Sequence, residues 1–130
     1  MTTTNPGAAV GAPRLILRAE GAAAAAAGLW LFMQGGQSWW LFAILLFAPD
    51  LAFAAYLAGA RAGAVAYNIV HSTLGPLLLA AAAWWFGSDL ALALAGIWLT
   101  HVGMDRALGY GLKYPTAFQD THLGRIGRDS

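Results

Sequence analysis

Four long apolar runs, joined by connections of only a few residues, limit what this chain can fold into more than any other feature. The runs lie at about residues 15–34, 38–58, 62–86 and 88–108, and the connections read GGQ, GAR and GS. A helix of about 20 apolar residues crosses a hydrocarbon layer of about 30 Å. Backbone polar groups in lipid need partners within their own segment, and these runs lack the alternation of a membrane β-barrel. The sequence therefore predicts an all-α fold, an up-down-up-down bundle of four transmembrane helices.

A soluble four-helix bundle is the alternative fold, and the composition argues against it. The helices of a soluble bundle need polar outer faces. Segments such as WWLFAILLFA, residues 39–48, have none, and the chain is 59% hydrophobic and only 10% charged. The net charge of +1 also leaves no basic field for nucleic acid. We therefore expect the lipid bilayer as a partner, and no nucleic acid.

The chain divides into a short tail, a membrane domain and a second tail. Residues 1–14 are small and polar with two prolines, which predicts a disordered N-terminal tail. Residues 15–112 form the transmembrane domain, and residues 113–130 are expected to be a cytoplasmic C-terminal tail. Glu20 interrupts the first apolar run, so we interpret that run as a retained helix and not as a signal peptide.

The basic residues predict the orientation of the helices. With four passes, every lysine and arginine falls on one side of the membrane, and the two loops on the other side carry none. Basic residues favour the cytoplasmic side, so both termini are expected there. Arg106 and Lys113 are expected to reach lipid phosphates at this surface.

Each predicted helix places at least one ionisable group in the cytoplasmic half of the membrane. At 1.5 Å per residue, these groups lie between about 5 and 13 Å from the inner helix ends. Charges in hydrocarbon are expensive and normally face the bundle interior, where they pair. We therefore predict that they converge, and the set consists of Glu20, Asp50, His71, His101 and Asp105.

Helical spacing supports this convergence. His101 and Asp105 are four residues apart and share one helix face, as do Tyr67 and His71. Asn68 stands three residues before His71 and joins the same face.

Two prolines stand next to members of this set. Pro49 directly precedes Asp50, and Pro76 follows His71 by about one turn. Proline removes a backbone donor and clashes with the preceding turn, so each position is expected to loosen or kink its helix.

The polar set leaves three interpretations open. With His122 added, three histidines and three carboxylates could bind Zn, Mn or Fe, which accept nitrogen and oxygen ligands. The same residues could form a pathway for protons or a small ligand. They could also be a structural network of the pairs Arg18–Glu20, Asp50–His71 and His101–Asp105. His122 itself could fold back as a lid or a further ligand, or it could only cap the bundle.

Two classes of function correspond to these interpretations. As an enzyme, the protein would use metal-activated water to hydrolyse a lipid-like ester or amide at the inner leaflet, with a carboxylate as base. As a binding or transport module, it would carry protons, a metal ion or a small ligand, and so thin a bundle would then need a homo-oligomer. Ser72 and Thr73 stand beside His71 but lack a triad, which argues against covalent hydrolysis.

The segments PDLAFAAYLAGARAGAVAYNIVH (49–71) and HVGMDRALGYGLKYPTAFQDTHLGRIG (101–127) resemble a bacterial membrane family called domain of unknown function 4260. The resemblance extends over residues 18–127 and includes the Arg18 and Glu20 positions, the GYGLKY segment and the THLG segment with His122. It implies a small multi-pass protein of the bacterial inner membrane that carries this polar set. It implies no particular reaction or ligand.

Overall fold

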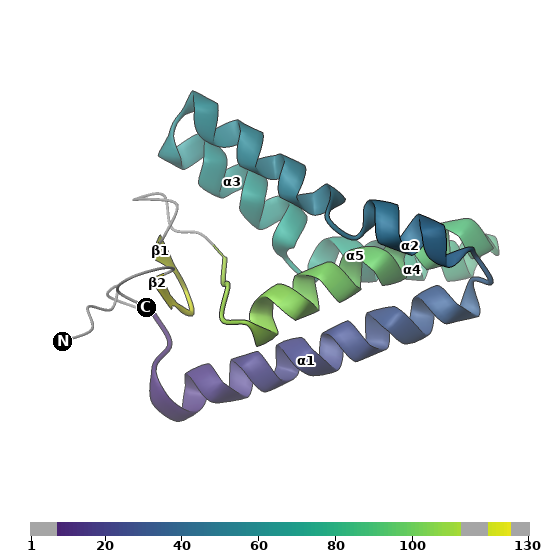
Figure 1. Cartoon of the computed structure of the whole chain (residues 1–130), viewed down its shortest axis with the longest axis horizontal. Helices are drawn as coiled ribbons and strands as arrows, with labels where there is room; N and C mark the ends of the chain where they lie inside the picture. The colour runs from purple at the N-terminus through teal and green to yellow at the C-terminus, as the bar shows by residue number, and fades with distance from the viewer. Residues whose placement is uncertain (1–7, 113–119, 126–130) are drawn as a thin grey trace.

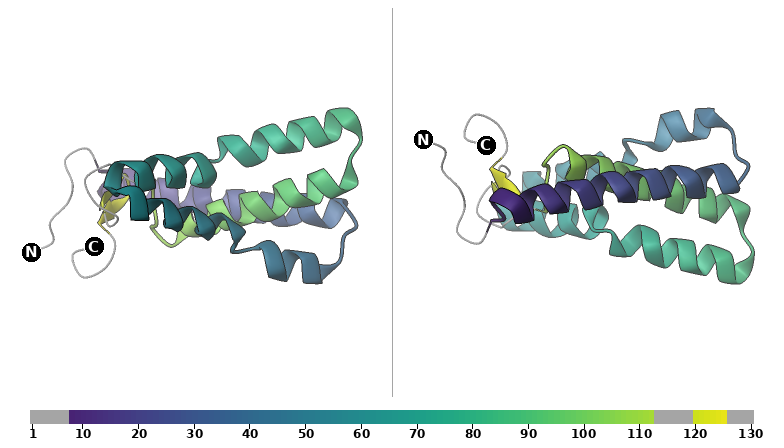
Figure 2. Two further views of the ribbon diagram at one scale, coloured as in Figure 1. Left: turned by 90° about the horizontal axis from the view of Figure 1, so that it is seen from above. Right: turned by 90° about the horizontal axis from the view of Figure 1, so that it is seen from below.

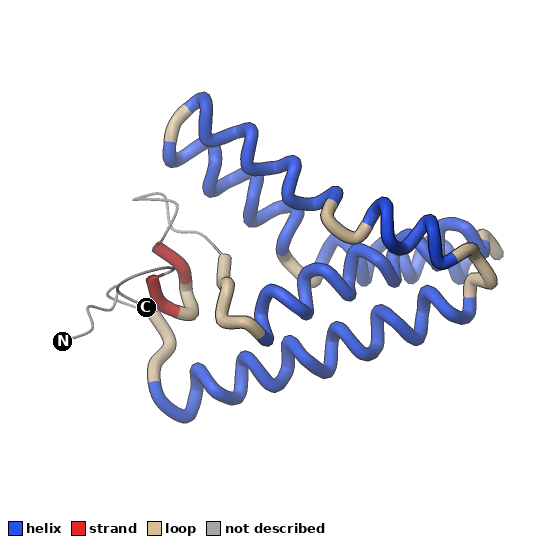
Figure 3. Tube along the Cα trace, in the orientation of Figure 1, coloured by secondary structure: helices blue, strands red, loops and turns tan. Residues whose placement is uncertain are grey.

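The computed structural model describes residues 8–112 and 120–125, and these residues are almost entirely helical (Figures 1 and 3). The all-α prediction is confirmed. A two-stranded hairpin near the C-terminus is added to it. In chain order the elements are α1 (Gly11–Gln34), α2 (Trp39–Leu45), the 3-10 helix η1 (Ala48–Ala58), α3 (Ala60–His71), α4 (Leu74–Phe86), α5 (Asp89–Ala107), β1 (Asp120–Thr121) and β2 (Gly124–Arg125).

Helices α1 and α5 pack against each other in opposite directions along most of their length (Figure 1). Glycines make this approach close. A Cβ on Gly28 would lie 2.5 Å from the backbone nitrogen of Thr100, and a Cβ on Gly103 would meet the backbone of Ala25. Small residues of this kind allow helix backbones to come together inside a membrane. The first and last helices therefore form the closest pair in the fold.

The second and third predicted helices, over 38–58 and 62–86, are each broken into two pieces. Helix α2 ends at Leu45, and η1 then begins with Pro49 in its first turn. Helix α3 ends at His71, where Ser72 takes an extended conformation, and α4 follows with Pro76 in its first turn. Proline cannot donate the backbone hydrogen bond that would continue the preceding helix, so both breaks occur where the prolines predict them.

Helix η1 and α3 form a hairpin that packs on itself. Gly59, with φ of 121°, makes the turn between them. A Cβ on Gly63 would collide with the ring of Tyr56, so the two short helices touch closely just after the turn. Phe53 on η1 stacks on Tyr67 on α3, with ring centroids 5.4 Å apart. This hairpin carries Asp50 and His71 to their positions.

Within the described residues, three segments are long and apolar enough to cross a membrane: Gly11–Gln34, Trp39–Ala58 and Ala60–Phe86. These segments indicate that the protein is associated with a membrane. The fourth predicted span, α5, is not among them. It carries polar side chains and has ten buried residues, more than any other described helix. Helix α5 is therefore covered by protein and needs less apolar surface toward lipid.

The hairpin of β1 and β2 packs at the end of the molecule where α1 begins, as both views of Figure 2 show. The backbone N–H of Ala9 donates to the His122 carbonyl at 2.7 Å, and Arg14 Nε donates to the Leu123 carbonyl at 2.6 Å. Thr121 and Leu123 are fully buried. This part of the predicted C-terminal tail is thus a docked cap on the bundle.

Candidate metal centre

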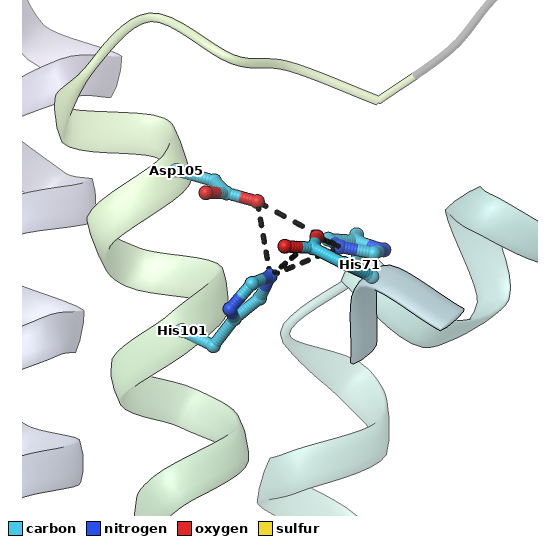
Figure 4. A group of neighbouring side chains, drawn as sticks. His71, His101 and Asp105 are labelled. Atoms are coloured by element: carbon cyan, nitrogen blue, oxygen red, sulfur yellow. Dashed lines mark hydrogen bonds and ion pairs between the residues drawn. The ribbon is translucent and has the colours of Figure 1, made fainter. Parts of the chain in front are cut away.

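Four of the six predicted site residues lie together in the structure. Asp50 comes from η1, His71 from the last position of α3, and His101 and Asp105 from successive turns of α5. Each offers one potential ligand atom, and these four atoms all lie within 4.8 Å of one another. Figure 4 shows the side chains of His71, His101 and Asp105 pointing toward a common centre. We call these four residues the polar cluster.

The separations within the polar cluster are short and similar. Asp50 Oδ1 lies 3.2 Å from His71 Nε2 and 3.1 Å from His101 Nε2. Asp105 Oδ2 lies 3.3 Å from His101 Nε2 and 3.7 Å from His71 Nε2. The two Nε2 atoms are 3.1 Å apart. Both imidazoles therefore direct the same nitrogen at both carboxylates and at each other.

The backbone sets the orientation of the His71 ring. His71 Nδ1 lies 3.0 Å from the carbonyl oxygen of Tyr67, and a carbonyl can only accept, so Nδ1 carries a proton. In a neutral ring, Nε2 then has a free lone pair that faces the cluster. The Tyr67 ring stacks on the His71 ring at a centroid distance of 3.7 Å and holds its plane. Residues at this four-residue spacing share a helix face, as the sequence predicts.

Arg106 and Trp98 stabilise the helix break beside the cluster. The break frees backbone carbonyls that a continuous helix would use. Arg106 donates to the carbonyl of His71 at 2.8 Å, and Trp98 Nε1 donates to the carbonyl of Val70 at 2.5 Å. Both side chains belong to α5, so the helix that carries His101 also caps the end of α3.

Burial differs among the four members of the cluster. His71 and His101 are almost completely buried, and the Asp105 side chain is 12% exposed. The Asp50 side chain is 35% exposed. Three members of the cluster are therefore largely shielded from solvent, and Asp50 on η1 is the most exposed one.

Glu20 and His122 are not part of the polar cluster. Glu20 is exposed on α1, and His122 accepts a hydrogen bond from the backbone N–H of Leu112 at 2.8 Å. Both line a separate cavity of about 360 Å³ between α1, the α3–α4 break and the C-terminal hairpin. Of the roles foreseen for His122, capping is the one that this geometry fits. Burial and the nearby positive charge of Arg106 lower the pKa of His122 below its usual value.

The supporting residues fall into three groups. Tyr67 and Arg106 contact the cluster, as described above. Arg18 donates to the carbonyl of Ala107 at 2.9 Å, and no ion pair joins it to Glu20 within the described residues. Asn68 is half-buried on α3 outside the four-residue group, and Lys113 lies outside the described residues.

Sequence reasoning missed two aromatic residues that support the cluster. Trp98 binds the carbonyl at the end of α3, and Phe53 extends the ring stack over Tyr67. Trp98 stands three residues before His101 on α5, and this spacing on one helix face was the signal that could have found it. Phe53 carries no such signal, because its position depends on the 3-10 geometry of η1.

Comparison with known proteins supports the family resemblance. A family model described as "Domain of unknown function (DUF4260)" matches residues 14–126, which is most of the chain. The chain belongs to this family. The matched region contains every member of the polar cluster together with Glu20 and His122, so all the polar residues discussed here lie within the DUF4260 domain. No curated protein and no solved structure matches the chain.

Proposed function

We propose that the polar cluster binds a divalent transition metal, with Zn, Mn and Fe as the candidates. Zinc bound by histidine and carboxylate has metal–ligand distances of about 2.0–2.1 Å, which puts the edge of its coordination tetrahedron at about 3.3 Å. The five nitrogen–oxygen and nitrogen–nitrogen separations given above lie between 3.1 and 3.7 Å. Five of the six edges between the four ligand atoms are thus close to those of a tetrahedral site, and the sixth, between the two carboxylate oxygens, is at most 4.8 Å.

The observation that carries the proposal is the 3.1 Å separation of the two Nε2 atoms. Without a metal, at most one proton fits between these nitrogens, because two N–H groups aimed at each other would repel. Two carboxylates with one added proton still leave a net charge of −1, and a buried charge of this kind is costly. A divalent ion at the centre neutralises both carboxylates and accepts both lone pairs. This argument favours metal binding over a purely structural network.

The open side of the cluster supports a hydrolytic role for the bound metal. A catalytic zinc site keeps one position for water beside three protein ligands, and two histidines with one carboxylate is a known set. His71, His101 and Asp105 supply that set once a water replaces the Asp50 carboxylate as the fourth ligand. The exposed Asp50 carboxylate is then placed to take a proton from the attacking water. The metal would polarise the scissile carbonyl or the water.

A second cavity supports a lipid-like substrate. It measures about 280 Å³ and lies between α2, η1, α3 and α5. Its lining is apolar and includes Pro49 and Val70, the residues directly before Asp50 and His71. An acyl chain in this cavity would bring its ester or amide bond toward the polar cluster. We therefore propose a metal-dependent hydrolase that acts on lipid-like substrates.

The proposed setting is the bacterial inner membrane, with four passes and both termini in the cytoplasm. The packing of α1 against α5 in opposite directions is consistent with an even number of passes. The docked hairpin also keeps the start of α1 next to the segment that follows α5. Under this topology the polar cluster lies in the cytoplasmic half of the membrane.

Metal analysis of the purified protein tests this proposal most directly. We expect about one Zn, Mn or Fe per chain in the wild type and little in His71→Ala, because loss of a ligand in the innermost shell weakens a metal site strongly. Asp89→Asn, at the start of α5 and far from the cluster, is the matched control and should keep its metal. A wild type without metal after growth in each of the three metals contradicts the proposal.

Hydrolysis is tested separately with a fluorogenic acyl ester in detergent micelles. The metal-loaded wild type should hydrolyse the ester, and Asp50→Asn should lose about 100-fold or more in rate, as expected for loss of a general base. If the metal-loaded wild type shows no hydrolysis, the cluster functions instead as a metal-binding or transport site.

A further inference from the structure

The cavity lined by Glu20 and His122 contains charged and polar side chains that are not part of the proposed metal centre. Among the described residues, its other polar lining consists of Arg106 and the hydroxyls of Ser72 and Thr73, and its apolar rim includes Leu17, Ala24 and Leu74. Helix α1 packs mainly along α5, and the cavity lies between α1 and the α3–α4 break. Leu74 on its rim is exposed, so in the proposed membrane setting lipid would contact this rim.

One wall of this cavity presents hydrogen-bond donors. Arg106 is 9% exposed and uses two of its five N–H groups on backbone carbonyls, those of His71 and Tyr110. No carboxylate lies within ion-pairing distance of Arg106 in the described part of the chain. His122 accepts the Leu112 N–H at Nδ1, so in the neutral ring its Nε2 carries a proton and can donate. An anionic group would satisfy both donors.

The cavity also presents acceptors. The Glu20 carboxylate lines it but makes no ion pair with Arg106 or with any other described residue. The hydroxyls of Ser72 and Thr73 at the helix break add further acceptors. A ligand that satisfies both the donors and the acceptors is zwitterionic, with its anion at Arg106 and its cation at Glu20.

We propose that this cavity binds the headgroup of an aminophospholipid, a phosphate joined to a primary ammonium as in phosphatidylethanolamine. A volume of about 360 Å³ holds a headgroup but not a whole lipid, and the apolar rim lets the acyl chains run along α1 and α4. A primary ammonium donates three hydrogen bonds, which suits a carboxylate and two hydroxyls. A choline group has no N–H donor and prefers an aromatic cage, and the described residues of this lining include no aromatic side chain. The site goes beyond the proposed metal centre and does not depend on it.

Lipid selectivity in nanodiscs tests the inference. The discs contain equal parts phosphatidylethanolamine, phosphatidylcholine and phosphatidylglycerol, and native mass spectrometry counts the lipids that stay bound to the released protein. We expect phosphatidylethanolamine to be enriched roughly tenfold over the other two lipids, the effect of one charge-assisted hydrogen bond. Equal retention of the three lipids, or enrichment of phosphatidylglycerol, overturns the proposal. A chelator should not change the result, which separates this test from that of the metal centre.

Two matched pairs of variants localise the effect. Glu20→Gln should lose the preference for phosphatidylethanolamine, whereas Asp89→Asn should keep it. Ala24→Phe fills the cavity and should remove the bound lipid, whereas Ala23→Phe, exposed on the same helix, should not. Equal losses within either pair overturn the assignment to this cavity. Circular dichroism confirms that each variant is folded.

Free phosphoethanolamine distinguishes the lipid from a soluble ligand with the same headgroup. In detergent, phosphatidylethanolamine should raise the thermal midpoint of the wild type, and free phosphoethanolamine at the same concentration should not, because it lacks the acyl chains that pack on the rim. An equal shift with the free compound overturns the membrane-lipid assignment.

Discussion

Helices α1 and α5 run without interruption and meet through glycines, whereas η1, α3 and α4 are short pieces separated by breaks beside the polar cluster. In the first region the backbone hydrogen bonds run along uninterrupted helices, and close packing supplies the stability. In the second region, helix ends expose backbone groups that polar side chains such as Arg106 and Trp98 must satisfy. The difference shows that α1 and α5 form a scaffold and that the shorter pieces bring Asp50 and His71 to it.

The largest effect on stability is expected inside the polar cluster. His101→Leu and Asp105→Leu should each cost about 3 kcal/mol or more, because each leaves a buried polar partner without its pair. The double variant should recover much of this loss, since no polar group is then left unpaired.

Thermal unfolding with a chelator and with added Zn²⁺ or Mn²⁺ gives the measurement. Only the wild type should show a different thermal midpoint with chelator and with added metal, because the variants lack a complete ligand set. A wild type that is indifferent to both additions, with an equally stable double variant, would contradict metal binding and support a purely structural network.

A substitution between α1 and α5 should destabilise the protein nearly as much as one in the polar cluster, because these two helices pack very closely. Gly28→Leu places a large side chain against the backbone of Thr100 and should destabilise the protein by about 3 kcal/mol through overpacking. Ala26→Leu, on the exposed side of the same helix, should leave the thermal midpoint almost unchanged. Similar midpoints for the two variants would mean that the glycine contact between α1 and α5 is not the basis of the packing.

Removing the break between α3 and α4 is expected to lower protein stability less than the substitutions above, and to lower the metal affinity of the polar cluster measurably. Pro76→Ala restores a backbone donor and lets α3 continue through Ser72, which moves His71 away from α5. Stability should fall by about 1 kcal/mol from lost apolar burial, and metal affinity in a competition assay should fall about tenfold. Leu78→Ala, exposed on α4, is the control. An unchanged affinity in Pro76→Ala would show that the break is not needed to position His71.

The smallest expected effect concerns pH and the C-terminal hairpin. The pKa of His122 is lowered in the docked state, mainly by burial, so docking favours the neutral ring. Docking should be complete above the usual histidine pKa of about 6.5 and should weaken as the pH falls below it toward the lowered value. Hydrogen exchange at the Leu112 amide measures this change. His122→Asn keeps an acceptor for that amide and should abolish the pH dependence. A wild-type exchange rate that follows only the intrinsic chemical rate would contradict the prediction.

Much of the helical content and most of the cluster could be predicted from the sequence, because apolar length and four-residue spacing depend on local chain geometry. Counting residues along each helix predicted that Asp50, His71, His101 and Asp105 lie at similar depths in the membrane, and the structure brings these four residues together. Depth does not say which way a side chain points around the helix axis, and Glu20 therefore falls outside the cluster. The prolines predicted kinks, but the 3-10 geometry of η1 depends on its packing against α3.

The pairing of the first helix with the last has a consequence for biosynthesis. Hydrogen bonds link Ala25 to Thr100 and Arg14 to Leu123, across 75 and 109 residues of chain. During synthesis, α1 enters the membrane long before α5 has been made. Until then, the glycine face of α1 and Glu20 are in contact with lipid or with an insertion factor. The native contacts of α1 become available only after α5 and the hairpin have been synthesised. Synthesis of α5, and not insertion of the first helix, is therefore expected to time the final assembly.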